Sequence, residues 1–195
     1  MSEIEPAVDL WRRDQILTWP NLFTLIRLLC IPIFVWLLFG PGNRAAAAWL
    51  LAALGSTDWV DGWLARRLHQ QTAFGAVFDP TVDRLLLVVA VPSLIIDESI
   101  PMVLAVLILA REISTAVLAL AAQFRADHRM AVTREGKTGA FLMMFAVPMF
   151  LGANSTLSYA PALAWLAWLF AMPGLGFGWY STLFQYLPLV RRLLA

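Results

Sequence analysis

The sequence predicts an all-α integral membrane protein with six transmembrane helices and a short N-terminal amphipathic helix at the membrane surface. Hydrophobic residues make up 61% of the 195 residues, and the mean hydropathy is +0.73. Several uncharged runs approach the ~20 residues that a helix needs to cross a bilayer. Six crossings place nearly all basic loop residues on one side of the membrane. This organisation leaves no room for a separate soluble domain.

The expected elements follow the chain in order. Residues 8–19 mix apolar and charged side chains in a pattern suited to a helix lying on the membrane, with an unstructured tail as the alternative. They end an N-terminal juxtamembrane segment, residues 1–19, which precedes a membrane domain of residues 20–195. The spans are expected at about 20–40, 45–69, 75–96, 100–123, 136–154 and 160–190. The last run contains Pro173 and several glycines, which predicts a kink within one crossing.

Loop charge predicts the orientation of the chain in the membrane. With six spans, Arg44 is the only basic loop residue on one side of the membrane, and the others lie on the side of the two termini. Because basic loops face the cytoplasm, both termini are expected there. The N-terminus does not resemble a cleavable signal, and the single Cys30 excludes an intrachain disulfide. No nucleic acid is expected as a partner. The basic residues on the cytoplasmic side are Arg12, Arg13, Arg66, Arg67, Arg125, Arg129, Arg134, Lys137, Arg191 and Arg192.

Four aspartates stand among apolar runs between residues 58 and 83. Asp58 and Asp61 are three residues apart, and Asp79 and Asp83 are four apart, so each pair shares one face of its helix. Both pairs are expected near the cytoplasmic face. A solvated interface position explains one such residue, but each intramembrane Asp costs about 2.5–3.5 kcal/mol. The cluster therefore predicts a divalent-cation site of the kind that Mg²⁺ or Mn²⁺ prefers.

Other polar residues point to a phosphorylated ligand. Gly62 leaves room for a close approach to the backbone, and Arg66 offers a donor fork suited to phosphate. Asn21, Thr24 and Arg27 recur every three residues and share a face of the first span. The alternative for Arg27 is a side chain that reaches back to the lipid headgroups.

Arg111 and Glu112 lie in the middle of the fourth expected helix, where charges are costly unless they pair or face a polar cavity. Adjacent residues point in different directions on a helix, which makes a mutual salt bridge the weaker interpretation. The pair is therefore a second candidate functional position.

Eight residues stand at fixed offsets between positions 58 and 83: Asp58, Asp61, Gly62, Ala65, Arg66, Gly75, Asp79 and Asp83. They match every position of the signature of the CDP-alcohol phosphatidyltransferases, and the chain resembles this family over most of residues 20–150. This resemblance implies metal-dependent transfer of a phosphatidyl group from CDP-diacylglycerol to an alcohol, with release of CMP, in phospholipid biosynthesis. It also implies two divalent ions, a homodimer, and an active site at the cytoplasmic membrane.

The resemblance implies roles for individual residues. Asp58, Asp61 and Asp79 bind metal, and Asp83 completes the second metal site and acts as the general base. The residues implied to bind CDP-diacylglycerol are Gly62, Arg66, Thr72 and Gly75, with Asn21, Thr24 and Arg27 lining the nucleotide side.

The acceptor alcohol is expected to be glycerol 3-phosphate. Residues 20–27, 79–80, 110–112 and 136–138 resemble the phosphatidylglycerophosphate and cardiolipin synthase branch, and Arg111 and Lys137 are the candidate ligands of an acceptor phosphate. Arg84 and residues 134–138 depart from the usual phosphatidylglycerophosphate synthase pattern, which keeps phosphatidylglycerol, and hence cardiolipin, as an alternative. A divalent-cation transporter is the alternative of another class, but it does not need Gly62, Ala65 and Gly75 at fixed offsets.

Overall fold

The computed structural model describes residues 18–67, 75–126 and 133–194, and all regular structure within these ranges is helical. The all-α class is therefore confirmed for this part of the chain. Residues 8–17 of the expected surface helix and Thr72 lie outside it. The elements are α1 (Trp19–Phe39), α2 (Arg44–Arg67), α3 (Gly75–Ile96), α4 (Met102–Ala126), α5 (Arg134–Ala153), α6 (Ala160–Tyr180), the π-helical turn η1 (Ser181–Tyr186) and α7 (Leu187–Leu194).

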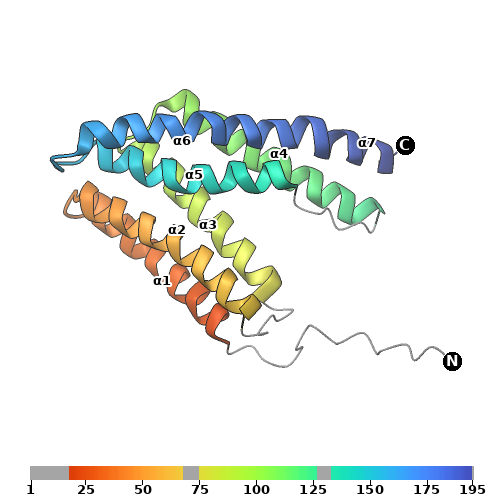
Figure 1. Ribbon diagram of the computed structural model, residues 1–195, viewed down its shortest axis with the longest axis horizontal. Coiled ribbons are helices and arrows are strands. Elements are labelled where there is room, and N and C mark those ends of the chain that lie inside the picture. The colour runs from red at the N-terminus through yellow and green to blue at the C-terminus, as the bar shows by residue number, and fades with distance from the viewer. Residues whose placement is uncertain (1–17, 68–74, 127–132, 195) are drawn as a thin grey trace.

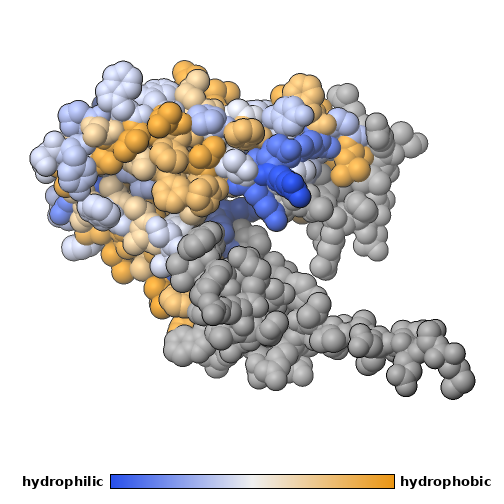
Figure 2. Space-filling model, in the orientation of Figure 1, coloured by the Kyte–Doolittle hydropathy of each residue, from blue (hydrophilic) through white to orange (hydrophobic). Residues whose placement is uncertain are grey.

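Four helical segments are long and apolar enough to cross a membrane: Asn21–Phe39, Met102–Ala121, Arg134–Ala153 and Ala160–Val190. Many of their large side chains face outward, and Trp165 is 81% exposed. Figure 2 shows apolar residues spread over much of the visible face, with a hydrophilic area toward one side. This distribution fits a bundle surrounded by lipid. A count of six crossings, which requires α2 and α3 to span as well, stays a prediction.

Two threonines are the N-cap residues of helices α1 and α5, which begin at the end of the bundle that contains the predicted site. Thr18 has an extended backbone, and its hydroxyl accepts a hydrogen bond from the Asn21 amide at 3.5 Å, with Pro20 in the first turn. Thr133 caps α5 in the same way, accepting from the Gly136 amide at 3.1 Å. These caps set the register of α1 and α5, because each fixes the residue at which its helix begins.

Helices α1 to α6 alternate in direction, so the α1–α2, α3–α4 and α5–α6 connections lie at one end of the bundle (Figure 1). Arg44 joins them there. Its Nε donates to Asp97 Oδ2 at 2.9 Å, and its Nη1 donates to the carbonyl of Asn154 at 3.3 Å. The side-chain amide nitrogen of Asn154, Nδ2, in turn donates to the backbone carbonyl of Ser99 at 3.1 Å. The first turns of α1, α3 and α5 and the last turn of α2 lie at the opposite end.

Helices α5 and α6 pack closely along their lengths (Figure 1). A Cβ atom added to Gly139 would lie 2.8 Å from both the Gly174 carbonyl oxygen and the Gly178 amide nitrogen. Small residues at this interface bring the two backbones together, as is common between membrane helices. Helix α2 packs on the other side of α5, with Gly55 against Met144. The hydrophobic core contains residues from all six long helices, α1 to α6.

Helix α6, the π turn η1 and helix α7 follow one another without a break from Ala160 to Leu194, and Ala160–Val190 is one candidate span, as the sequence indicates. Pro173 lies inside α6, and the departure from α-helical hydrogen bonding comes later, at η1. Ser181, Thr182 and Tyr186 of this π turn are buried. The sequence analysis did not predict this irregularity.

Candidate active site

Helix α1 holds two of the predicted aspartates of α3. The Thr24 hydroxyl donates to Asp79 Oδ1, and Arg27 Nη1, one turn further along α1, forms an ion pair with Asp83 Oδ1. Asn21 lies one turn earlier on the same face and is also buried. The structure thus brings the polar face of α1 against the acidic face of α3.

The ion pair has one buried partner and one accessible partner. Arg27 is 1% exposed, whereas the side chain of Asp83 is 42% exposed. Burial of a guanidinium costs several kcal/mol unless a counter-charge and hydrogen bonds compensate it. Arg27 is therefore held inside the bundle rather than reaching toward headgroups, and it pairs with a carboxylate that remains partly exposed.

The remaining predicted residues of this site lie on α2 or close to it. The helical backbone places Asp58, Asp61, Gly62 and Arg66 in the last part of α2, but the side chains of residues 58–67 lie outside the described part. Within that part, no three His, Cys, Asp or Glu side chains come together as metal ligands. Gly75 is buried at the first position of α3. The end of α2 and the start of α3 lie at the same end of the bundle (Figure 1).

The structure corrects the interpretation of Arg111 and Glu112. Arg111 Nη1 pairs with Glu112 Oε1, although the salt bridge between adjacent residues was the weaker expectation. Both side chains are long enough to bend toward each other beside the helix. Arg111 is 12% exposed, and its buried Nε has no hydrogen-bond partner among the described residues.

Lys137 is exposed in the first turn of α5, and its backbone amide donates to the Thr133 carbonyl at 3.0 Å. The π turn η1 holds this first turn. The hydroxyls of Thr133 and Ser181 lie 2.6 Å apart, and Tyr186 accepts from the Thr133 amide at 3.2 Å. A further hydrogen bond, 2.8 Å long, joins Gln185 to Glu135. The sequence analysis gave the last helix little role and missed these contacts.

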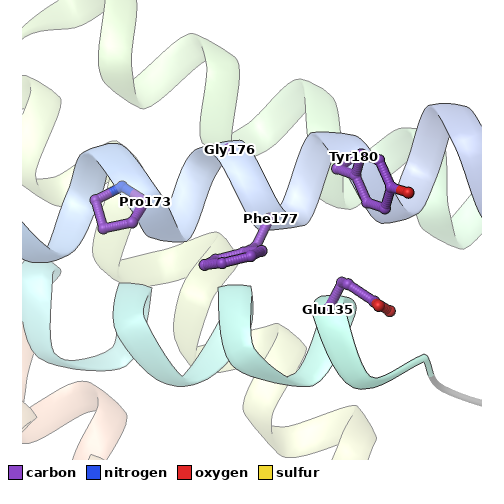
Figure 3. Close-up of a pocket in the computed structure, with 5 residues that line it drawn as sticks. All are labelled: Glu135, Pro173, Gly176, Phe177 and Tyr180. Atoms are coloured by element: carbon purple, nitrogen blue, oxygen red, sulfur yellow. The ribbon is translucent and has the colours of Figure 1, made fainter.

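A shallow pocket of about 540 Å³ lies between α5 and the second half of α6 (Figure 3). Phe177 projects from α6 toward α5, and Glu135 stands at the start of α5 (Figure 3). The described wall is apolar apart from Glu135 and Tyr180, and it includes none of the predicted site residues whose side chains the structure describes. The lining residues are Glu135, Pro173, Gly176, Phe177 and Tyr180.

The fold and these contacts define a class of protein: a helical membrane protein that holds carboxylates at one end of its bundle through a buried threonine and arginine. The comparison with known families gives the class its name. Residues 17–173 match the profile of the CDP-alcohol phosphatidyltransferases, and the chain belongs to this family.

Relatives within the family have two different activities in their names. The chain is 33% identical over 190 residues to the CMP-forming cardiolipin synthase of Streptomyces coelicolor, which covers 92% of this chain and 86% of the relative. It is 33% identical over 158 residues to the CDP-diacylglycerol–glycerol-3-phosphate 3-phosphatidyltransferase of Escherichia coli, covering 76% of each chain. The enzyme of the same name from Pseudomonas fluorescens is 49% identical over 78 residues, which are 39% of this chain and 40% of the relative.

The contact between Thr24 and Asp79 generates a prediction. Thr24→Val keeps the shape of the side chain but removes the donor to the carboxylate. A hydrogen bond to a charged group contributes about 1.5–3 kcal/mol, so we expect CMP release from CDP-diacylglycerol to slow by about ten- to a hundredfold. Thr156→Val, in the exposed connection at the opposite end, should leave the rate unchanged. Equal rates for the two variants would contradict a role for Thr24 in holding Asp79.

Proposed function

We propose that this chain transfers the phosphatidyl group of CDP-diacylglycerol to glycerol 3-phosphate and releases CMP. The observation that carries the proposal is the double contact of α1 with α3, in which Thr24 holds Asp79 and Arg27 holds Asp83. These contacts from α1 orient Asp79 and Asp83, two carboxylates of the family signature. Transfer of a phosphoryl-type group depends mainly on such positioning and on charge stabilisation.

The residues fit a site for two divalent cations, Mg²⁺ or Mn²⁺. Asp79 and Asp83 are hard oxygen donors one helical turn apart, and Asp58 and Asp61 precede them on α2. Arg27 pairs with Asp83, and the Thr24 hydroxyl donates to Asp79. These four aspartates would hold the ions, which when bound would neutralise the pyrophosphate and the departing CMP.

The reaction would begin with the acceptor hydroxyl near Asp83. The hydroxyl oxygen attacks the phosphorus atom that carries diacylglycerol, and Asp83 takes its proton. The bond between this phosphorus and the bridging pyrophosphate oxygen breaks, and CMP leaves with the electron pair. Arg27 keeps the Asp83 carboxylate in place. The residues that would hold the CDP moiety are Asn21, Gly62, Arg66, Thr72 and Gly75.

The proposed membrane orientation of the chain rests on the charge of its loops, and its proposed oligomeric state rests on the family resemblance. Both termini and the aspartate end would face the cytoplasm, with six spans and a surface helix at residues 8–19. At the opposite end, Arg44 is neutralised by Asp97, which increases the charge difference between the two ends. The chain would act as a homodimer, as the family resemblance implies.

Phosphatidylglycerol is a second candidate acceptor, with cardiolipin as the product. The match to the cardiolipin synthase of Streptomyces coelicolor covers 92% of this chain, more than the matches to the glycerol-3-phosphate enzymes cover. The sequence departures at Arg84 and residues 134–138 agree with this alternative.

A reconstituted assay tests the function and its metal dependence together. Purified protein in CDP-diacylglycerol micelles receives Mg²⁺ or Mn²⁺ and either glycerol 3-phosphate or phosphatidylglycerol, and CMP is quantified. We expect CMP only when an acceptor is present, no CMP in excess chelator, and recovery when the metal is restored. Full activity in chelator would overturn the metal proposal, and no CMP with either acceptor would overturn the transferase proposal.

A variant of Asp83 tests the general base. Asp83→Asn keeps an oxygen that can accept from Arg27 but cannot take the proton of the acceptor, so turnover should be lost while the protein still folds. Asp97→Asn is the matched control, because Asp97 also pairs with an arginine but lies at the far end. Turnover of Asp83→Asn within about tenfold of the parent would end the assignment.

A variant of Arg111 tests the acceptor site. Loss of one charge-assisted contact to a phosphate costs roughly 1.5–3 kcal/mol, so Arg111→Ala should raise the KM for glycerol 3-phosphate about ten- to a hundredfold. The Kd for CDP-diacylglycerol should change little. The effect should be smaller if phosphatidylglycerol is the acceptor, because its phosphodiester carries one charge and the bilayer holds its tails. An equal loss of affinity for CDP-diacylglycerol would place Arg111 in the donor site instead.

A further inference from the structure

Helix α6 has a bare backbone where the Arg111 side chain lies. A Cβ atom added to Gly178 would stand 3.0 Å from Arg111 Nε and 3.5 Å from both Cδ and Cζ. The buried Nε and its neighbours therefore lie directly against the Gly178 backbone, in space that any other residue would occupy. From this contact we propose that Gly178 is a positioning residue that sets the location of the Arg111 guanidinium, and through it the affinity for the acceptor phosphate. The proposal rests on the acceptor role of Arg111 argued above.

A pair of hydroxyls fixes the helices on either side of this contact. Thr115 on α4 and Thr182 on η1 have their Oγ1 atoms 3.0 Å apart. Each also lies within hydrogen-bonding distance of a carbonyl one turn earlier, Thr115 of Arg111 at 2.9 Å and Thr182 of Gly178 at 3.0 Å. These are the backbone carbonyls of Arg111 and Gly178, the same two residues that are in contact between α4 and α6. The threonines thus set the spacing of α4 and α6 where Arg111 meets Gly178.

Packing from the third side prevents α6 from moving away. The Gly178 amide nitrogen lies 2.8 Å from the position that a Cβ on Gly139 would take, so α5 already touches the Gly178 backbone. This packing of α5 on the Gly178 backbone restricts how far α6 can shift away from an added methyl group. The guanidinium is the part that can shift, since it ends a flexible side chain. A methyl at Gly178 would therefore move Arg111 while α6 keeps its place.

The test compares two alanine variants of the same helix. An alanine at position 178 meets Arg111, whereas an alanine at position 176 meets no described residue within 4 Å, so Gly176→Ala serves as the control for Gly178→Ala. With the acceptor that the parent protein uses, we expect Gly178→Ala to raise the acceptor KM by about tenfold while the KM for CDP-diacylglycerol and the midpoint of thermal unfolding stay near the parent values. Gly176→Ala should match the parent in all three. An equal rise in both KM values, or no rise in either, would overturn the proposal.

A double-mutant cycle separates positioning from general packing. If Gly178 acts through Arg111, adding Gly178→Ala to Arg111→Ala should change the acceptor KM less than about twofold, whereas independent effects would multiply. If Gly178→Ala does not fold, Thr115→Val is tested in the same cycle, because it loosens the same contact without adding volume. Additive effects would overturn the proposal. If Arg111→Ala alone leaves the acceptor KM unchanged, the acceptor role and this inference fall together; if only Gly178→Ala leaves it unchanged, this inference falls alone.

Discussion

The ion pair between Arg27 and Asp83 is the constraint on which the site depends. A guanidinium that is 1% exposed is tolerated because a carboxylate meets it, and loss of this carboxylate would remove a counter-charge of the buried arginine. The pair fixes α1 against α3 in both depth and rotation. One turn earlier, Thr24 meets Asp79 in the same register. A single helix contact thus stabilises the fold and aims the two carboxylates.

Other contacts that hold the bundle together lie away from the residues proposed to act. At the far end, Arg44, Asp97 and Asn154 join three connections through hydrogen bonds. Between the ends, small residues let α5 and α6 approach to backbone contact. These interactions need no contribution from the aspartate end. That end can therefore collect carboxylates whose mutual repulsion would otherwise weaken a small membrane protein.

Apolar run lengths and turn residues predicted the helices closely: α3 begins at Gly75 and ends at Ile96, as expected. The spacing of the aspartates predicted their shared faces, since that follows from helix geometry alone. The contacts of Thr24 and Arg27 span 55 and 56 residues along the chain, and no local pattern determines which helices pack together. The sequence analysis treated a salt bridge between Arg111 and Glu112 as the weaker interpretation, and the structure shows that this was wrong. The reasoning considered only the directions in which adjacent residues leave the helix and ignored the reach of long side chains.

The π turn was also beyond sequence reasoning, because residues 181–186 have an ordinary helical composition. Its wider turn changes which side chains point inward. Ser181 and Tyr186 reach Thr133 on α5, while Thr182 reaches Thr115 on α4. The two candidate acceptor residues, Arg111 and Lys137, lie on these same two helices. The relative position of Arg111 and Lys137 is therefore set by the last helix, which supplies neither residue. A substitution confined to the last helix would then change which acceptor the protein prefers without changing any charged residue.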